Sequence, residues 1–259
     1  MLWETVDSAD AALSTRFGFS DAGHAVAWLE EALREEWDVR VDSCDRLVIS
    51  ASNLLAWLTA DGRRLVAKVC AEASLFRHLA NVDAVIAWLQ DEGIPVAAPL
   101  IAIDGRVRVD RGGYSVSVYP FVGGSLLDVE DAGQVDAAGR MLASLHGALA
   151  SYPGPFGDRL PPDGQQLVHG DFRSANILQV DGAITAILDF DDASYGSRAE
   201  ELARSAVLLG TRYHDWQPIS RATREVFVSA YNEVAPLTSA ERYEFDQVVV
   251  AVSKDFGWT

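Results

Sequence analysis

Three polar residues in the second half of the chain have the types and the spacing that phosphoryl transfer requires. Asp171 and Asn176 lie five positions apart, directly after the apolar pair Leu167-Val168. Asp189 follows thirteen positions after Asn176, at the end of another apolar run. Two short strands that end at polar residues can bring these three side chains to one point. We therefore predict a site that combines one amide with two carboxylates.

This set of groups suits the transfer of the γ-phosphoryl group of a nucleotide to a hydroxyl. The transition state spreads negative charge over the phosphoryl oxygens, and magnesium neutralises that charge. Magnesium takes oxygen ligands and keeps several waters, so Asn176 and Asp189 are the predicted metal ligands. Asp171 is the predicted catalytic base, which orients the attacking hydroxyl and accepts its proton. The alternative is that these residues only favour turns, as Asp and Asn often do.

The motifs around these residues resemble those of the aminoglycoside phosphotransferase and choline kinase-like family. The His-Gly-Asp sequence at 169–171 replaces the His-Arg-Asp of protein kinases, and Asp-Phe-Asp at 189–191 replaces Asp-Phe-Gly. The Leu-His pair at 145–146 resembles the end of the helix that precedes the catalytic loop in that family. The resemblance covers residues 45–235 and is densest over 167–205. It implies a two-lobed protein-kinase-like fold, a bound ATP or GTP with Mg²⁺, and a small-molecule hydroxyl as the acceptor.

Lys68 is the predicted contact for the nucleotide phosphates. It stands among apolar residues of a predicted central strand, where a lysine is costly to bury unless it is paired. The resemblance implies that Lys68 holds the α- and β-phosphates and pairs with a helical carboxylate. Asp83, on a helix predicted over 75–91, is the predicted partner, and Glu72 and Glu92 flank that helix. An edge-strand lysine that faces water is the alternative.

Two further segments are predicted to bind the nucleotide. A polar loop between the first two strands contains Ser52 and Asn53, which resemble the phosphate-covering loop of small-molecule kinases and offer donors to phosphate oxygens. An ordinary polar hairpin is the alternative for this loop. A hinge after a later strand presents backbone groups to the base. Pro120 lacks an N–H group there, so Phe121 and Val122 are the predicted hinge contacts.

Three residues near the motifs have predicted supporting roles. His169 is expected to hold the catalytic loop through a structural hydrogen bond, and contact with the phosphate is the alternative. Gly170 is expected to allow close backbone packing beside the base. Arg204 is expected either to form an ion pair with the catalytic loop or to lie on the surface.

The elements that position these residues divide the chain into a β-rich part and an α-rich part. Hydrophobic periodicity and turn signals define them. The predicted elements of the first part are a helix over 20–37 capped by Ser20 or Asp21, strands over 47–49, 54–59 and 64–69 with a turn at Asp61-Gly62, a helix over 75–91, a hairpin of 101–103 and 107–109 around Asp104-Gly105, and a strand over 114–118.

A glycine pair, Gly123-Gly124, interrupts the regular pattern after the last of these strands and suggests a hinge. We therefore predict an α+β fold with an N-lobe over 1–122 and a helical C-lobe over 123–259. The predicted elements of the C-lobe are helices over 131–150, 198–210, 221–234 and 239–254 and short strands at 167–168 and 186–188.

Composition and charge limit the partners of the chain. The formal net charge of −17 disfavours nucleic acid and anionic membranes, which select basic patches, and suits a cationic substrate. Cys44 and Cys70 are the only cysteines and match neither a disulfide framework nor a zinc site. No signal peptide and no run of apolar residues long enough to span a membrane is evident. A cytoplasmic monomer or homodimer is the expectation.

The predicted function is an ATP-dependent phosphotransferase that acts on a small-molecule hydroxyl, with an aminoglycoside-like or other cationic antibiotic as one class of acceptor. A metabolite kinase for homoserine, a sugar or a choline-like alcohol is an alternative, and macrolides also stay open as acceptors. A nucleotide-binding pseudokinase or regulatory module is a second alternative, which the intact set of motif residues disfavours. A protein kinase is a third, disfavoured by Gly170 and by the lack of an Ala-Pro-Glu segment after Asp189.

Overall fold

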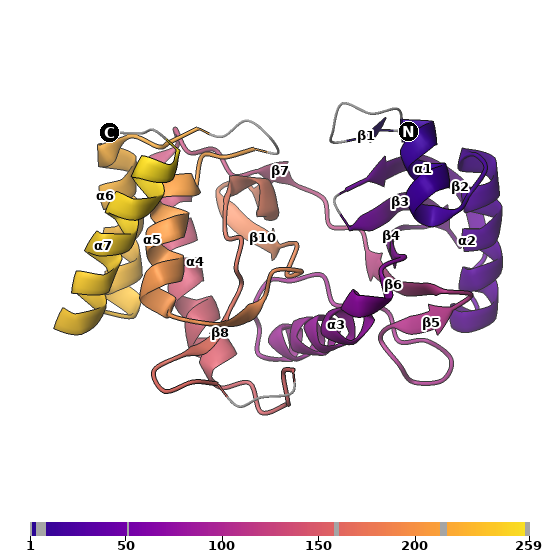
Figure 1. Cartoon of the computed structure of the whole chain (residues 1–259). Coiled ribbons are helices and arrows are strands. Elements are labelled where there is room, and N and C mark those ends of the chain that lie inside the picture. The colour runs from indigo at the N-terminus through magenta and orange to yellow at the C-terminus, as the bar shows by residue number, and fades with distance from the viewer. Residues whose placement is uncertain (1, 4–8, 51, 158–160, 213–216, 257–259) are drawn as a thin grey trace. The chain divides into compact units, whose positions relative to one another are not determined.

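The chain folds into two compact units in a computed structural model (Figure 1). Unit 1 comprises Met1–Ala87 and Ala97–Phe121, and unit 2 comprises Trp88–Val96 and Val122–Thr259. The segment Trp88–Val96, which was expected in the N-lobe, therefore packs with unit 2. The residues that the structure describes are 2–3, 9–50, 52–157, 161–212 and 217–256.

Unit 1 is built on a six-stranded sheet with the strand order β1-β2-β3-β4-β6-β5. Every neighbouring pair is antiparallel except β1 and β2, which are parallel. Asp61 and Gly62 close the β3–β4 hairpin with φ values of +48° and +71°, which confirms the predicted turn. The strands are β1 (Leu2–Trp3), β2 (Val41–Ile49), β3 (Asn53–Ala60), β4 (Arg63–Cys70), β5 (Val109–Arg111) and β6 (Tyr114–Pro120).

Helices α1 (Ala9–Phe17) and α2 (Ala22–Trp37) share one apolar core with this sheet. Helix α2 begins at the predicted cap, because the Asp21 carboxylate accepts the backbone N–H of His24 at 2.8 Å. Alternate residues of β3 are buried in this core, as expected for a strand with one covered face. Helix α1 escaped sequence prediction, since its apolar periodicity is weak.

The register of the strands places Lys68 on the opposite face of the sheet from α1 and α2. Val69, its neighbour in β4, is buried in the core that these helices cover. Successive side chains of a strand point to opposite faces, so Lys68 faces away from the helices. Lys68 lies directly opposite Leu55 of β3 and Ser117 of β6, and side chains paired in this way share a face.

The hairpin predicted around Asp104-Gly105 is wrong. The residues from 101 to 108 form no strand, because one local and one distant hydrogen bond compete with the sheet. The Asp104 carboxylate accepts the backbone N–H of Arg106 at 3.0 Å, and Ile103 donates its N–H to the carbonyl of Glu36 at 2.8 Å. The hairpin that does form joins β5 to β6 through Gly112-Gly113, where both glycines have positive φ.

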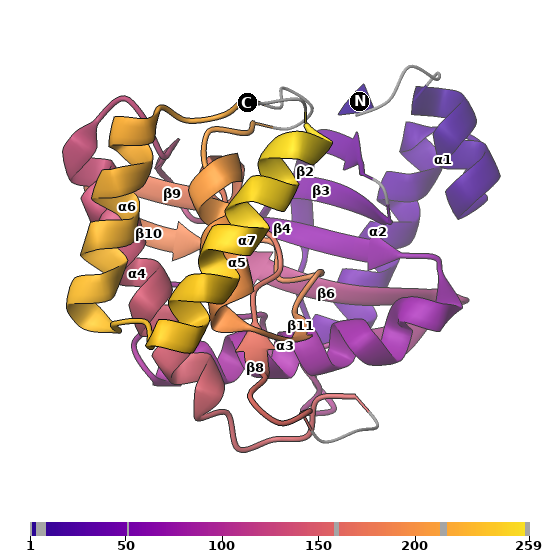
Figure 2. The same ribbon diagram turned by 60° about the vertical axis from the view of Figure 1, so that its left-hand side comes forward.

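Unit 2 is dominated by helices that agree with the predicted periodicity. They follow α3 (Phe76–Asp91), which also confirms its prediction. Helix α4 packs against α6, and α5 packs against α7, as both ribbon views show (Figures 1 and 2). The helices are α4 (Ala132–Ala150), α5 (Arg198–Leu208), α6 (Arg221–Val234) and α7 (Ser239–Asp255).

Short strands in unit 2 carry the loops that hold the polar motifs. A three-stranded sheet has the order β10-β9-β7, and β8 pairs with β11. Strands β7, β9 and β11 escaped prediction because they are two to four residues long. The strands are β7 (Ser125–Leu126), β8 (Gln166–Val168), β9 (Ile177–Val180), β10 (Ala183–Ile187) and β11 (Ser194–Gly196). Among the described residues, no helix combines the length and the apolar character needed to cross a membrane.

The contact between α4 and α6 yields a test with a matched control. A Cβ atom at Gly139 would lie 2.3 Å from the carbonyl oxygen of Phe227 and 3.0 Å from Cβ of Ala230. Gly147, on the same helix, has no atom within 4 Å of such a Cβ. We expect Gly139→Ala to lower the free energy of unfolding by about 1–3 kcal/mol through overpacking. We expect Gly147→Ala to raise it by about 0.5–1 kcal/mol.

Urea unfolding followed by circular dichroism measures both changes. Equal effects of the two substitutions would contradict the close approach of α4 and α6 at Gly139.

Candidate active site

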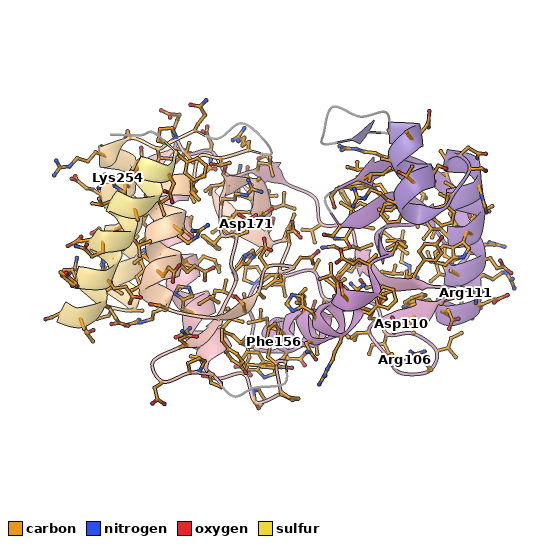
Figure 3. The ribbon with its side chains drawn as sticks, viewed as in Figure 1. Arg106, Asp110, Arg111, Phe156, Asp171 and Lys254 are labelled. Atoms are coloured by element: carbon orange, nitrogen blue, oxygen red, sulfur yellow. The ribbon has the colours of Figure 1, made fainter. Side chains whose placement is uncertain are left out.

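The predicted base Asp171 lies in the loop that follows β8 and is labelled in Figure 3. Its carboxylate oxygen Oδ2 accepts hydrogen bonds from Arg173 Nε at 2.9 Å and from Asn176 Nδ2 at 2.8 Å. Asn176 Nδ2 also reaches the Asp171 carbonyl oxygen at 2.9 Å. Burial raises the pKa of the Asp171 carboxyl, although the Arg173 guanidinium opposes that rise. Two of the three predicted residues are therefore in direct contact.

The catalytic loop is anchored by Glu201, a buried carboxylate on α5. Glu201 accepts the backbone N–H groups of His169, at 3.0 Å, and of Gly170. It also lies 2.7 Å from Nε2 of His146, whose Nδ1 lies 2.8 Å from the hydroxyl of Tyr231. Burial alone would raise the pKa of Glu201, but the hydrogen bond from His146 and the attraction of nearby groups outweigh it, so its pKa is lowered. The carboxylate is therefore ionised and compensated inside the unit.

Glycine is the only residue type that fits at position 170 of this loop. Its φ is +87°, and a Cβ atom there would lie 2.3 Å from the carbonyl oxygen of Asp192. Both the backbone conformation and the close approach exclude a side chain. The expectation that Gly170 allows close packing beside the base is confirmed.

His169 links this loop to the segment that carries Asp189. Its Nδ1 accepts the backbone N–H of Asp171 at 3.1 Å, so its Nε2 carries the proton that meets the Leu188 carbonyl oxygen at 3.0 Å. The ring also packs against Phe190, with centroids 4.3 Å apart. The predicted structural role of His169 is confirmed.

The β9–β10 hairpin brings Asn176 and Asp189 to the same end. Asn176 immediately precedes β9, and Asp189 follows β10 by two residues. The two chain segments are joined where Leu188 donates its N–H to the Asn176 carbonyl oxygen at 2.8 Å. Asp189 has a φ of +60°, in the left-handed region that costs free energy for a residue with a side chain. Such a conformation is typical of residues held for function.

The donors at this end of the hairpin fit a magnesium ion. Asn176 turns its amide nitrogen to Asp171, so its amide oxygen faces the other way. Asp189 is exposed and supplies a carboxylate. Two oxygen ligands of this kind, completed by water and phosphate oxygens, are the usual protein share of a magnesium–nucleotide site. Asn176 and Asp189 would hold the ion.

The residues predicted to bind the nucleotide in unit 1 have different surroundings. Asp83 is fully buried on α3, and the charge of Lys68 acts on it. Asp83 forms an ion pair with Arg108, in which Arg108 Nε lies 2.6 Å from Asp83 Oδ2. Asn53 is buried as well, and its backbone closes the turn with Ser50 by a hydrogen bond of 2.8 Å. Ser52 is half-buried within this turn.

The predicted hinge contacts differ in what their backbones can offer. The N–H of Phe121 donates to the Arg64 carbonyl oxygen at 3.0 Å, which extends the β4–β6 ladder. The Arg64 guanidinium lies over the Phe121 ring, 3.6 Å from its centroid. This amide is therefore engaged within unit 1, so a contact of Phe121 with a base would have to use its carbonyl group. Val122 begins the next segment of unit 2.

The roles of three residues were not predicted from the sequence: Glu201, Arg173 and Arg108. For Arg204, an ion pair with the catalytic loop and a surface position were both left open. Arg204 is exposed on α5, and Glu201, three positions before it, contacts the catalytic loop instead. Glu201 gives no clear signal in the sequence, because its neighbours three and four positions away on the helix are Ser197, Arg198, Arg204 and Ser205. Arg108 gives no signal either, since its partner Asp83 lies 25 positions away.

The anchor predicts a loss of stability with a specific pH dependence. We expect Glu201→Gln to lower the free energy of unfolding by about 2–4 kcal/mol at pH 7, because a charged acceptor of three hydrogen bonds is lost. The folded-state pKa of Glu201 is lowered, so its contribution is complete above the ordinary value of 4.5 and is lost as the pH falls through the folded-state pKa. The difference between wild type and variant should therefore shrink at acidic pH.

Denaturant unfolding at a series of pH values measures this difference. Glu225→Gln is the control, because Glu225 forms an exposed pair with Arg221 on α6 and exposed pairs contribute little. A difference that stays constant down to pH 3 would contradict an ionised anchor.

Comparisons with known proteins agree with this geometry. The model of the phosphotransferase enzyme family, APH, matches residues 46–164 and 155–238. The serine/threonine protein kinase RdoA of Salmonella typhimurium is 27% identical over 196 residues, which cover 59% of this chain and 56% of that protein. The chain thus spans little more than half the length of the curated relatives that it matches.

Two solved structures share the fold. The amicoumacin kinase hAmiN, in complex with AMP-PNP, Ca²⁺ and Ami, superposes with a TM-score of 0.67 at 14% identity, over 86% of this chain and 84% of that one. A microcompartment-associated aminopropanol kinase superposes with a TM-score of 0.66 at 20% identity, over 86% and 85%. These likenesses confirm the α+β, kinase-like fold. With the family model matching well over half of its length, the chain belongs to the phosphotransferase enzyme family.

Proposed function

We propose that the chain is a magnesium-dependent kinase that transfers the γ-phosphoryl group of ATP or GTP to a hydroxyl of a small, amine-bearing molecule. The observation that carries this proposal is the joint position of three side chains in unit 2. Asp171 is held by Asn176, and the backbone of Asn176 is joined to the segment of Asp189. A base beside two oxygen ligands is the arrangement that phosphoryl transfer needs.

Asp171 would orient the acceptor hydroxyl and take its proton. Arg173 and Asn176 both donate to Oδ2, which leaves Oδ1 to face the hydroxyl. Burial raises the pKa of this carboxyl, which makes it a better proton acceptor than an exposed aspartate. The backbone of the loop, held by Glu201, keeps this carboxylate in one orientation.

Asn176 and Asp189 would hold the metal, and Lys68 would contact the nucleotide phosphates. A bound magnesium ion neutralises the charge on the phosphoryl oxygens. Ser52, Asn53, Asp83, Phe121 and Val122 stay predictions for the nucleotide contacts, with the Phe121 amide already engaged in the sheet.

A cavity of about 300 Å³ in unit 2 supports the choice of acceptor. Asp171 lines it together with Tyr195 and the carboxylates of Asp192 and Glu200. The lining contains two arginines, Arg173 and Arg204, and Arg173 is paired with Asp171. Carboxylates thus outnumber guanidinium groups, which favours a cationic acceptor. The volume is at the lower end of the range for small-molecule sites, about 300–1,000 Å³.

These features favour a compact amino alcohol over a large antibiotic. Aminoglycoside-like and other cationic antibiotics also carry amines and hydroxyls, so they stay candidates for the acceptor. The structural neighbour described as an aminopropanol kinase is consistent with this class of acceptor. Homoserine-like, sugar-like and choline-like alcohols are the further members to be tested.

A second candidate is a protein kinase. The observation that favours it is the relative from Salmonella typhimurium, which is described as a serine/threonine protein kinase. A serine or threonine hydroxyl would then take the place of the small alcohol. The small cavity beside Asp171 favours the small-molecule reading.

The test is a phosphorylation screen over amino alcohols, cationic antibiotics and sugars, with a serine-containing protein mixture as a separate arm, read out by mass spectrometry. We expect a phosphate ester on an amine-bearing small molecule. Phosphate on protein alone would replace the proposal with the second candidate. Release of inorganic phosphate alone would contradict both.

Asp171→Asn tests the role of the base. We expect kcat to fall by about 10²–10⁴-fold, which is the usual contribution of a general base, with nucleotide affinity nearly unchanged. Asp181→Asn is the matched control, because Asp181 lies in the β9–β10 turn with a φ of +51°, which asparagine tolerates. Steady-state kinetics on the acceptor found by the screen measure both variants. A kcat of Asp171→Asn within a few-fold of the control would remove Asp171 from the chemistry.

A further inference from the structure

Three buried polar residues of unit 1 and the half-buried Tyr119 form one hydrogen-bonded group, which we call the Asp83 cluster. Its members are Asp83 of α3, Arg108 of the segment before β5, and Ser117 and Tyr119 of β6. Arg108 Nε lies 2.6 Å from Asp83 Oδ2, and Arg108 Nη2 lies 2.7 Å from Ser117 Oγ. The Tyr119 hydroxyl donates to Asp83 Oδ1. Both carboxylate oxygens of Asp83 are thus held from different sides.

The ion pair at the centre of this cluster is among the most buried in unit 1. The side chains of Arg108 and Asp83 are 2% and 0% exposed. Removing two charges from water is costly, and the cost is offset only when geometry is good and the remaining donors are satisfied. Arg108 meets that condition, because it also reaches the Ser115 carbonyl oxygen at 3.4 Å. A pair of this kind fixes the orientation of the Asp83 carboxylate.

The cluster lies on the same face of the sheet as Lys68. Ser117 is directly opposite Lys68 in the register of β4 and β6, and Tyr119 is two positions further along the same strand. Residues two positions apart in a strand share a face. The charge of Lys68 acts on both Asp83 and Tyr119. The predicted phosphate contact and the cluster therefore form one electrostatic group.

The electrostatics of this group centre on Asp83. Burial raises the pKa of the Asp83 carboxyl, and Arg108, Tyr119 and Lys68 oppose that rise. Burial also raises the pKa of the Tyr119 phenol, so this hydroxyl stays a neutral donor. The orientation of the Asp83 carboxylate therefore sets how strongly it attracts Lys68.

We propose that Arg108 is a positioning residue for the nucleotide phosphates: with Tyr119 it holds the Asp83 carboxylate in one orientation, so that this carboxylate orients Lys68 toward the phosphates without closing onto it. This inference rests on the proposed function, in which Lys68 contacts the phosphates. It adds a second cation to a lysine–carboxylate pair that sequence reasoning had expected to stand alone.

The test uses the affinity for a fluorescent ATP analogue with Mg²⁺, which needs no knowledge of the acceptor. We expect Arg108→Met to weaken this affinity by about ten-fold or more, because a hydrogen-bonded charge pair is broken and Asp83 turns to Lys68. We expect Arg108→Lys to restore part of the loss, since it keeps the charge but not the forked geometry. Folding of each variant is checked by circular dichroism.

Arg111→Met is the matched control. Arg111 lies three positions further along, on β5, and is labelled in Figure 3. It pairs with Glu35 and Glu36 of α2 at 2.6 and 3.0 Å, away from Lys68. We expect its loss to leave the affinity for the ATP analogue unchanged.

Tyr119→Phe decides the question if Arg108→Met does not fold. It keeps the ring and removes only the hydroxyl that donates to Asp83. We expect about a three- to ten-fold weaker affinity, because Asp83 loses one hydrogen bond but keeps its ion pair with Arg108. Unchanged affinity in a folded Arg108→Met protein, or in Tyr119→Phe, would overturn the proposal.

Lys68→Met separates this inference from the proposed function. If Lys68→Met weakens binding of the ATP analogue while Arg108→Met and Tyr119→Phe do not, only the positioning role fails. If Lys68→Met has no effect either, the assignment of Lys68 to the nucleotide fails, and the inference fails with it. If all three weaken binding, the double variant of Lys68 and Arg108 should lose less than the sum of the single losses, since both residues act through Asp83.

Discussion

The hydrogen bonds of the buried Glu201 carboxylate hold the loop on which the proposed chemistry of unit 2 depends. A charged group that is buried away from water needs compensating partners. The Glu201 carboxylate has three: two backbone N–H groups of the catalytic loop and the ring of His146. The loop cannot move away without leaving that charge uncompensated. A loop with a glycine at its centre would otherwise have wide conformational freedom, and Glu201 removes it.

The consequences of this anchor extend along the chain to the metal ligands. With the backbone of His169 held by Glu201, the His169 ring is placed to meet the Leu188 carbonyl oxygen. Leu188 in turn donates to the Asn176 carbonyl oxygen, and Asn176 holds Asp171. A continuous set of hydrogen bonds therefore joins the candidate base Asp171 to Asn176 and to Leu188, the residue next to Asp189. The same principle operates in unit 1, where a second buried carboxylate, Asp83, is held by Arg108 and Tyr119.

Local signals were sufficient to predict much of this structure. Helix α2 starts at its capping aspartate, the β3–β4 turn forms at Asp61-Gly62, and the motif residues Asp171, Asn176 and Asp189 follow short strands as expected. These features depend on neighbours in sequence. The features that escaped prediction depend on distant partners: Glu201 meets a loop that is 31 and 32 positions away. The hairpin at Asp104-Gly105 failed for the same reason, since Ile103 is bound to the backbone of α2.

We propose that Asp171 acts as the base and that Asn176 and Asp189 hold the metal. The binding of Mn²⁺ in the presence of a non-hydrolysable ATP analogue tests this proposal most directly. Electron paramagnetic resonance measures the Mn²⁺ affinity of wild type, Asp189→Asn and Asp171→Asn. We expect Asp189→Asn to weaken Mn²⁺ binding by about ten-fold or more, through loss of a carboxylate ligand, and Asp171→Asn to bind Mn²⁺ nearly as tightly as wild type. Equal affinities of all three proteins, or a loss confined to Asp171→Asn, would contradict it.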